Sequence, residues 1–371
     1  MKKRYLFIDG QLNAGGAERV LIDVLRKFDF ELYEVDLLQI IAGGALIDEI
    51  PKQVHVLHAW NDYTAGYKLA LHASIQLRIS WFWRRRMLQA LKGRKYDVVI
   101  SFLEGMPLKA HSLITDIAER NYSWVHCDLD IDRYEKGMFF DEIDELKAYN
   151  QMTSVVCVSM MSKQAFLKRF SGISTSVGVI YNFIDIEGIL QKASGKLMFN
   201  NAFTIIVVGR LTSPKKTDRV IRLAARLKKE NKRTKIQLIG DGPLRGEIER
   251  QVQDLGVEEM VDFLGFIRNP YPYIKAADLL LSTSGHEGFS LVVGEAMTLG
   301  TPVVATKTAG PMEILGESEY GLLCEHDDES IYQAVVSMID SPQMRENYSR
   351  KGKERVAFFD VASTMEKIYK L

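Results

Sequence analysis

Residues 282–306 read STSGHEGFSLVVGEAMTLGTPVVAT, and this stretch decides how the second half of the chain is interpreted. The apolar run at residues 279–281 just before it predicts a buried strand, Ser290 suits the N-cap of a helix, and a Thr-Pro pair leads into a further strand. Loops between parallel strands and helices lie where open α/β sheets bind ligands. We therefore expect a ligand-binding loop with Glu287 before the helix and Glu295 one turn inside it.

The start of this helix offers free backbone N–H groups and a positive dipole end, which suit a phosphate. Phe289, Ser290 and Leu291 occupy that position and are therefore predicted to lie against the ligand. Taken without their surroundings, the two glutamates could equally be solvent-facing residues that stabilise a helix start.

A second block, VVGRLTSPKKTDRVI at residues 207–221, also predicts the binding of a phosphate or another anion. It predicts a strand that ends at Gly209, followed by Arg210 and by Lys215 and Lys216 just before a helix. Unpaired cations are electrostatically unfavourable at a helix N-terminus. This position therefore favours an anionic ligand over three unpaired surface cations.

Together these blocks resemble the signature of the retaining glycosyltransferases of family 4, which have the GT-B fold. The resemblance implies that Glu287 contacts the donor sugar and that Glu295 contacts the ribose of the nucleotide. It also implies that Arg210 and Lys215 stabilise the departing diphosphate. Where the family motif has a glycine after the lysine, this chain has Lys216, which leaves open which lysine reaches the phosphate.

Three further motifs match the same family. The strand-to-helix turn Gly-Asp-Gly-Pro includes Gly242, which the resemblance places close to the nucleotide. Gly15 and Gly16 lie between the first strand and its helix, where they are expected to border the donor phosphates and the acceptor. His126 ends a predicted strand, and the resemblance implies a contact with the donor sugar. Without the resemblance, a plain tight turn and a structural histidine would be equally good interpretations.

The fold class predicted from these patterns is α/β, with two Rossmann-like domains that face each other across a cleft. Strand-length apolar runs alternate with helical patterns, which is typical of parallel sheets covered on both faces. Strands are predicted at residues 5–8, 35–40, 54–57, 98–102, 122–126, 155–158, 177–181, 204–208, 235–239, 261–264, 279–281, 302–305 and 322–324.

The predicted N-terminal domain covers residues 1–185 and faces the acceptor, and the nucleotide-sugar-binding domain covers residues 186–355. Residues 186–202 are expected to form a polar linker. Residues 356–371 are expected to form a terminal helix that crosses back to the first domain.

Composition narrows the class of protein. The 371 residues include 48 basic and 48 acidic side chains, so no overall charge favours nucleic acid as a partner. Three cysteines, far apart in sequence, predict neither a disulfide framework nor a paired metal site, and indicate a cytoplasmic protein. The first residues predict a strand rather than a secretory leader, and no apolar run reaches the length of a membrane span.

We expect no metal and no cofactor besides the nucleotide-sugar donor. Asp128, Asp130 and Asp132 resemble a D-x-D metal motif of another transferase fold. Family 4 enzymes use protein cations for that role instead, and Arg210 and Lys215 are present.

Residues 75–95 carry a feature outside the family signature, because the predicted helix combines aromatic residues with arginines at Trp81–Arg86. This combination suits an anionic membrane interface. A core-packed aromatic pair with a solvated basic end explains the pattern equally well. Peripheral attachment to the inner face of the cell membrane is therefore one of two open interpretations.

The predicted function is retaining transfer of a hexose or N-acetylhexosamine from a nucleotide diphosphate sugar, UDP being favoured, to a glycan or lipid-linked acceptor. Bacterial surface polysaccharide synthesis is the expected setting. Two alternatives stay open: a nucleotide-sugar epimerase or hydrolase on the same fold, and a non-catalytic glycan- or lipid-binding partner of another transferase.

Overall fold

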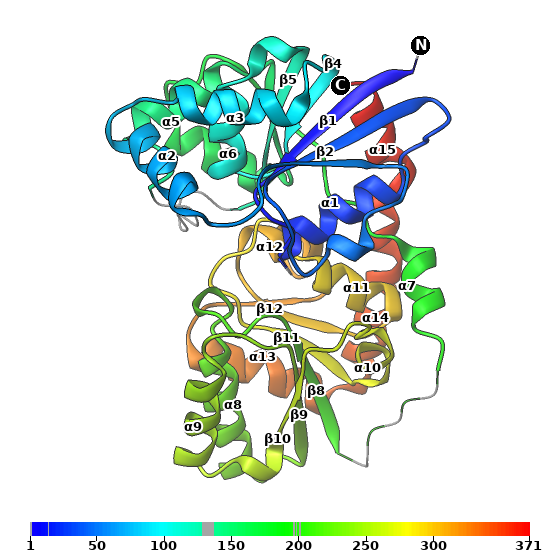
Figure 1. The fold of residues 1–371 in the computed structure, drawn as a ribbon. Coiled ribbons are helices and arrows are strands. Elements are labelled where there is room, and N and C mark those ends of the chain that lie inside the picture. The colour runs from blue at the N-terminus through cyan, green and yellow to red at the C-terminus, as the bar shows by residue number, and fades with distance from the viewer. Residues whose placement is uncertain (1, 14, 128–136, 196, 198, 200–201) are drawn as a thin grey trace. The chain divides into compact units, whose positions relative to one another are not determined.

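The structure is a computed structural model, and the chain separates into two compact units (Figure 1). The first unit comprises Met1–Asn182 and Ala362–Leu371, and the second comprises Phe183–Val361. The residues described are 2–13, 15–127, 137–195, 197, 199 and 202–371.

The first unit is built on a sheet of seven parallel strands in the order β3-β2-β1-β4-β5-β6-β7. The strands are β1 (Lys3–Asp9), β2 (Tyr33–Ile41), β3 (His55–Trp60), β4 (Tyr96–Ser101), β5 (Ala118–Val125), β6 (Ser154–Cys157) and β7 (Ser176–Val179). The helices are α1 (Gly16–Arg26), α2 (Ala65–Gln76), α3 (Trp81–Leu91), α4 (Met106–Ser112), α5 (Glu142–Asn150), α6 (Met160–Arg169) and, from residue 362 on, α15 (Val361–Tyr369).

The second unit repeats this plan with six parallel strands in the order β10-β9-β8-β11-β12-β13. The strands are β8 (Phe203–Val208), β9 (Thr234–Ile239), β10 (Val261–Gly265), β11 (Leu279–Ser282), β12 (Val303–Thr306) and β13 (Leu322–Cys324). The helices are α7 (Ile186–Lys192), α8 (Thr217–Lys229), α9 (Arg245–Asp254), α10 (Tyr271–Ala276), α11 (Leu291–Leu299), α12 (Ala309–Leu315), α13 (Asp328–Asp340) and α14 (Pro342–Val356).

Apolar periodicity accounts for both kinds of element. In the central strand β1, the run from Tyr5 to Ile8 is fully buried, as expected for a strand covered on both faces. The apolar residues of α8 recur at helical spacing, and Val220, Ala224 and Leu227 pack into the core of the second unit. Every strand predicted from the sequence is present, and the α/β fold class is confirmed.

The helices differ in whether a side chain caps their first turn, and this difference bears on ligand binding. Asp141, Ser159 and Asp327 each accept a hydrogen bond from the amide three residues ahead and so cap α5, α6 and α13. In the second unit, α8, α11 and α12 follow the strands β8, β11 and β12, and none of these three helices has a side-chain cap. First-turn N–H groups of α8 and α11 are therefore available to a ligand, whereas in α12 the amide of Gly310 donates to the carbonyl of Glu287.

Two expectations about chain organisation need correction. Residues 186–192 form the helix α7 and not a linker, because Asp185 caps the helix start at Gly188 and Ile189 is buried. Residues 356–371 are not one helix either. The chain leaves α14 at Val356, makes a short turn that buries Phe359, and begins α15 anew.

The last helix is anchored within the first unit by Tyr369. Its ring stacks on Tyr33 with centroids 4.5 Å apart, and its hydroxyl donates to the carbonyl of Lys27 at 3.0 Å. Among the described helices, none combines the length and the apolar character that crossing a membrane requires.

Gly240 shows how tightly the carboxyl ends of β8 and β9 pack. Its φ is +136°, and a Cβ atom there would lie 1.9 Å from the carbonyl oxygen of Gly209. Only glycine fits such a position without moving the neighbouring backbone.

We predict that Gly240→Ala lowers the free energy of unfolding of the second unit by about 3 kcal/mol, from backbone strain and the clash. Denaturant titration measures this loss. The matched control is Gly246→Ala in α9, where an added Cβ meets nothing within 4 Å. The control should be neutral or stabilising by up to ~1 kcal/mol, and equal losses in both variants would contradict the packing argument.

His111 is a buried titratable group in the first unit. Its Nδ1 lies 3.1 Å from Ser101 Oγ, and its Nε2 lies 2.9 Å from Asn121 Oδ1. Burial lowers the pKa of His111 to about 4, so the imidazole is neutral in the folded protein.

Because the unfolded chain takes up this proton near pH 6.5 and the folded chain near pH 4, stability is lost as the pH falls through this window. We predict that His111 alone costs about 2 kcal/mol of the unfolding free energy at pH 5 relative to pH 7. Denaturant titrations at both pH values, compared with His111→Gln, measure this share. An NMR signal of His111 that titrates above pH 6 in the wild-type protein would contradict it.

Candidate active site

The order of strands in the second sheet brings two distant loops together. β8 pairs with β9 on one side and with β11 on the other, so the chain reverses its direction of winding between β8 and β11. Ligands bind at such a switch point in open α/β sheets. The loops that follow the two strands, residues 209–216 and 283–290, carry most of the predicted site residues.

Hydrogen bonds lock these loops to each other. The hydroxyl of Thr283 donates to the carbonyls of Lys215 and Lys216, at 3.2 and 3.1 Å. The amide of Gly285 donates to the carbonyl of Pro214 at 2.7 Å. The relative position of the loops is therefore set by hydrogen bonds within the chain and does not depend on a ligand.

Glu287 lies at the centre of the arrangement. Its Oε1 accepts hydrogen bonds from Lys215 Nζ and, at 3.0 Å, from the hydroxyl of Ser284. The Glu287 side chain is only 8% exposed, whereas that of Lys215 is 33% exposed. Lys215 thus presents an oriented ammonium to the surface, and two of its three N–H bonds remain for an anion.

Arg210 is the second cation at this edge of the sheet. It follows Gly209 at the end of β8 and is exposed, and its guanidinium forms no hydrogen bond or ion pair with another described residue. The aliphatic part of Lys215 runs across Gly209, because a Cβ atom there would lie 3.4 Å from Lys215 Cε. Lys215 therefore packs along the backbone at Gly209.

The start of α11 completes an anion-binding surface. Ser290 holds the N-cap position, as predicted, but its side chain does not cap the helix, and its hydroxyl is buried without a partner among the described residues. Phe289 is buried before the helix, and Leu291 is the first helical residue. The free amides of this turn and the Ser290 hydroxyl can all donate to a phosphate.

The helix α12 holds this turn in place from behind. The amide of Gly310 donates to the carbonyl of Glu287 at 2.6 Å. A Cβ atom on Gly310 would lie 2.7 Å from the amide nitrogen of Ser290. Residues 287–290 are consequently fixed by close backbone packing.

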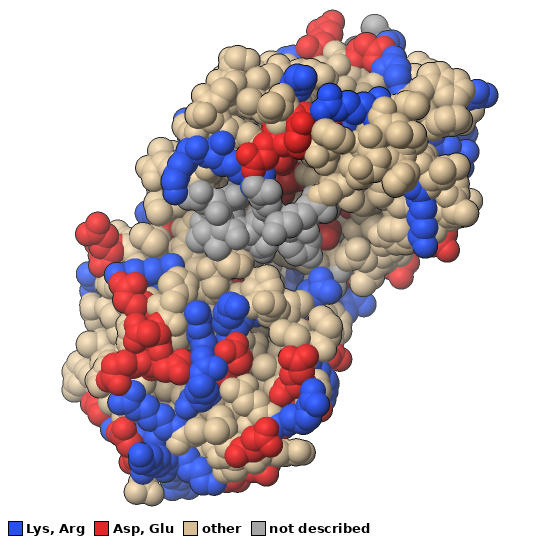
Figure 2. Space-filling view, turned by 90° about the vertical axis from the view of Figure 1, so that its left-hand side faces the viewer, with Lys and Arg blue, Asp and Glu red and all other residues tan. Residues whose placement is uncertain are grey.

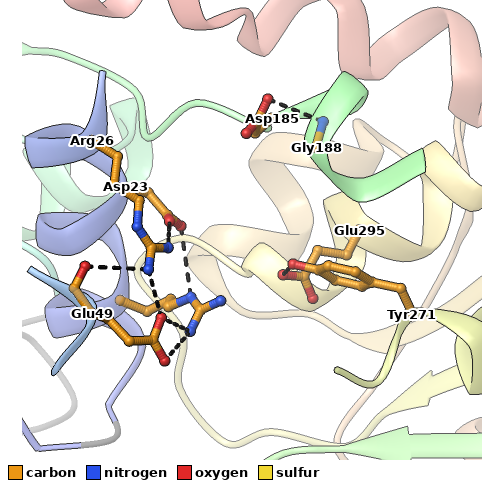
Figure 3. Close-up of polar contacts among 8 residues, drawn as sticks. Asp23, Arg26, Glu49, Asp185, Gly188, Tyr271 and Glu295 are labelled. Atoms are coloured by element: carbon orange, nitrogen blue, oxygen red, sulfur yellow. Dashed lines mark hydrogen bonds and ion pairs between the residues drawn. The ribbon is translucent and has the colours of Figure 1, made fainter. Parts of the chain in front are cut away.

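Glu295 projects from the first turns of α11, and Tyr271 at the start of α10 holds it. The Tyr271 hydroxyl donates to Glu295 Oε1 at 3.1 Å (Figure 3). This contact orients a carboxylate that could accept two hydrogen bonds from a diol such as ribose. Tyr271 was not foreseen from the sequence, since it lies 24 residues from Glu295 and no motif connects them.

Lys216 and Gly242 have clear structural roles as well. Lys216 takes a left-handed conformation with φ of 49° as the chain enters α8, and its side chain passes Gly285. A Cβ atom on Gly242 would lie 2.4 Å from the carbonyl oxygen of Leu211, so this glycine permits close packing of two strand ends.

In the first unit, Gly15 and Gly16 begin α1 after β1. Neither has a positive φ, and a Cβ atom on Gly16 would meet nothing within 4 Å. The backbone conformation therefore does not require glycine at residue 16. The absence of a side chain there leaves space in which a ligand can approach the backbone closely. The arginine of the same segment, Arg19, is used internally: it pairs with Glu49 at 3.2 Å, as Arg26 does at 2.8 Å (Figure 3).

His126 follows β5 and lies against Phe102, with ring centroids 4.8 Å apart. Its Nε2 is buried without a partner among the described residues, and burial lowers its pKa to about 3. His126 is therefore a neutral imidazole that can form a hydrogen bond but carries no charge. Its amide and that of Cys127 donate to Glu104 Oε1, and burial raises the pKa of this carboxyl group.

No cluster of three or more metal-ligating side chains occurs in the described part of the chain. Asp128, Asp130 and Asp132, which form the D-x-D pattern, lie outside the described residues. The expectation of a metal-independent protein thus stays a prediction.

The structure gathers Arg210, Lys215 and Glu287 on one edge of the second sheet, and it places Gly15, Gly16 and His126 on the first unit. Ser284 and Thr283 are additional site residues that were not predicted. Their position directly after an apolar strand was the available signal, because polar residues at that edge face the ligand side.

This chain is similar in sequence and in fold to known proteins. Residues 191–355 match the family model described as "Glycosyl transferases group 1". A Campylobacter jejuni protein named N-acetylgalactosamine-N,N'-diacetylbacillosaminyl-diphospho-undecaprenol 4-alpha-N-acetylgalactosaminyltransferase is 37% identical over 184 residues, which cover 49% of this chain and 49% of that protein. The chain thus spans about half the length of this relative.

A second C. jejuni protein, named GalNAc-alpha-(1->4)-GalNAc-alpha-(1->3)-diNAcBac-PP-undecaprenol alpha-1,4-N-acetyl-D-galactosaminyltransferase, is 25% identical over 98% of this chain and 97% of its own. Among solved structures, Anabaena HepE in complex with UDP-glucose superposes with a TM-score of 0.78 and 23% identity, over 99% of this chain and 98% of that one. The structural likeness shows the fold, and the predicted GT-B class is confirmed.

We predict that Arg210→Ala weakens the binding of UDP by roughly 10- to 100-fold, because a hydrogen bond to a charged group contributes about 1.5–3 kcal/mol. Isothermal titration calorimetry measures the affinity. The control is Arg233→Ala, since Arg233 is also exposed on the second unit and its side chain bonds to no described residue. Equal UDP affinity in the Arg210 variant and the wild-type protein would remove Arg210 from the site.

Proposed function

We propose that this chain is a retaining glycosyltransferase, because its residues 191–355 match the family model of the glycosyl transferases group 1. The proposed reaction moves a hexose or N-acetylhexosamine from a nucleotide diphosphate sugar, UDP being favoured, to a glycan or lipid-linked acceptor. The observation that carries this proposal is the Lys215–Glu287 ion pair beside the uncapped start of α11, on the sheet edge where Arg210 follows β8.

The donor diphosphate binds the second unit at this edge of the sheet. Its phosphate oxygens accept hydrogen bonds from the first-turn amides of α11 and from Lys215, and Arg210 reaches them from the exposed side. Negative charge grows on the departing phosphate as the glycosidic bond breaks. Fixed cations therefore stabilise the transition state more than the ground state.

Two carboxylates orient the rest of the donor. Glu287 Oε1 is held by Lys215 and Ser284, which leaves Oε2 to accept a hydrogen bond from a sugar hydroxyl. Glu295, held by Tyr271, binds the ribose hydroxyls. These contacts position the anomeric carbon relative to the cations, and orientation of this kind supplies a large part of enzymatic rate enhancement.

The chemical step needs no enzymatic nucleophile. The bond from the anomeric carbon to the phosphate oxygen breaks, and the acceptor hydroxyl forms the new bond on the same face of the sugar. The acceptor proton passes to the departing phosphate oxygen, so charge and atoms balance. Arg210 and Lys215 supply the positive charge that a metal ion would otherwise provide, and we propose that the reaction is metal-independent.

The names of the similar proteins suggest which donor and acceptor to propose for this chain. Both Campylobacter jejuni proteins are named for transfer of N-acetylgalactosamine to undecaprenol-linked sugars, and HepE binds UDP-glucose. For this chain we therefore propose a UDP-sugar donor and a lipid-linked acceptor in bacterial surface polysaccharide synthesis. The first unit would bind the acceptor, and the enzyme would work in the cytoplasm at the inner face of the cell membrane.

We predict that one UDP-sugar stabilises the protein against heat and that UDP is released when a lipid-linked or glycan acceptor is added, equally well with EDTA. A panel of UDP-, GDP- and ADP-sugars, read by thermal shift and nucleotide release, tests this. Release without any acceptor at the full rate would indicate a hydrolase, and conversion of the donor sugar to an epimer would indicate an epimerase. No stabilisation by any donor would overturn the proposal.

The control is Glu287→Gln, which keeps the size of the side chain and removes the charge. It should lose transfer by at least about 100-fold, the order of loss expected when a preorganised charged group is removed. Its stabilisation by UDP alone should change little, because Glu287 is assigned to the sugar. Undiminished transfer would contradict this assignment.

A further inference from the structure

The charge of the chain is unevenly distributed although its total is zero. Residues 61–95, which contain α2 and α3, hold eight lysines and arginines against a single acidic residue, Asp62. This segment of the first unit is therefore strongly basic, because its own acidic residue cannot balance its eight positive charges.

The same segment concentrates exposed apolar side chains. Of the fifteen large apolar side chains exposed in the described part of the chain, six lie between residues 63 and 82. They are Tyr63, Leu69, Leu77, Ile79, Trp81 and Phe82. Scattered exposed apolar residues are ordinary, but a concentration of this kind marks an interaction surface.

The helix α3 explains how this surface is held. Trp83, Met87 and Leu91 recur every four residues and are buried in the core. Trp81 and Phe82, which pack edge-to-face, are 55% and 56% exposed. The aromatic pair is therefore presented on a firmly anchored helix and cannot fold back into the core, where Trp83 already fills the space.

Arg85 lies against the aromatic pair. The guanidinium of Arg85 lies 5.2 Å from the ring centroid of Trp81, and Arg86 is the next residue on the exposed side. Arg78 and Arg84 are paired with Asp141 and Asp116. By contrast, Arg85 and Arg86 form no ion pair with a described residue.

We call residues Leu77, Ile79, Trp81, Phe82, Arg85 and Arg86 the α2–α3 surface. Figure 2 looks onto the side of the first unit where Figure 1 draws α2, and its upper part shows wide uncharged areas with Lys and Arg side chains among them. A binding partner that complements the α2–α3 surface must offer an apolar region for the aromatic side chains and negative charges beside it for the arginines.

We propose that the α2–α3 surface docks on an anionic lipid bilayer. Trp81 and Phe82 enter the boundary between headgroups and acyl chains, where amphipathic and aromatic side chains bind favourably. Arg85 and Arg86 contact the lipid phosphates. Docking rests on these side chains and not on the proposed transferase activity, but it would bring a lipid-linked acceptor to the first unit.

Vesicle co-sedimentation tests the electrostatic part. The full chain should bind vesicles of phosphatidylcholine with 30% phosphatidylglycerol and should not bind pure phosphatidylcholine. The variant R85S/R86S should bind the anionic vesicles about 30-fold more weakly, from roughly fivefold per arginine near an anionic surface. The matched control K229S/R233S removes two exposed cations from the second unit and should bind as the wild-type protein does.

The variant W81S/F82S tests the apolar part and should weaken binding by at least about tenfold. Its control is L32S/L255S, which removes two other exposed leucines. Thermal unfolding of every variant checks that the fold is retained.

Intrinsic fluorescence gives a readout that does not depend on a loss of binding. The chain has four tryptophans, and Trp60, Trp83 and Trp124 are buried, so Trp81 alone is exposed. Anionic vesicles should shift its emission to the blue, and brominated lipids should quench it. In Trp81→Phe, binding should persist while the spectral change disappears.

Three outcomes would overturn the proposal. Equal binding of the wild-type protein and both surface variants would show that other residues contact lipid. A spectral change that survives in Trp81→Phe would come from a buried tryptophan and not from insertion. Absence of vesicle binding, together with a wild-type dimer that W81S/F82S turns into a monomer in sedimentation velocity, would identify a second copy of the chain as the occupant.

Discussion

The parallel pairing of β8 with β11 is the constraint on which the candidate site depends. Ile205 and Ile206 align with Leu279 and Leu280, which makes the two strand ends meet although more than 70 residues of chain separate them. Thr283 then fastens the following loops by its bonds to the carbonyls of Lys215 and Lys216. An ammonium and a carboxylate from different parts of the chain consequently meet in a fixed geometry.

Several helix starts are capped by side chains, whereas the starts of α8 and α11 at the candidate site are not. Side chains close the starts of α5, α6 and α13, where they stabilise the helix. At α8 and α11 the same positions are left uncapped, and the buried hydroxyl of Ser290 has no partner among the described residues. Unsatisfied donors cost stability unless a ligand accepts their hydrogen bonds. The pattern fits a protein whose site is completed by an anion.

Local signals accounted for the elements and for much of the site, but not for side-chain partners. The strands and the loop from Glu287 to Leu291 follow from apolar periodicity and turn residues alone. The helix α7 was missed because its exposed polar residues outnumber its buried ones, and the buried contact of Ile189 is tertiary. Tyr271 could not be found at all, since its hydroxyl reaches Glu295 only through the packing of α10 on α11.

The sequence by itself determined the fold class and predicted an anion-binding site, because these depend on periodicity and on short motifs that are read locally. Only the tertiary structure decided that Lys215, and not Lys216, pairs with Glu287, and that Ser290 leaves α11 uncapped. It also decided that Trp83 is buried while Trp81 and Phe82 are exposed. The physical reason is that ion pairs, caps and burial depend on which side chains the sheets bring together, and neighbouring residues in one chain cannot specify distant partners.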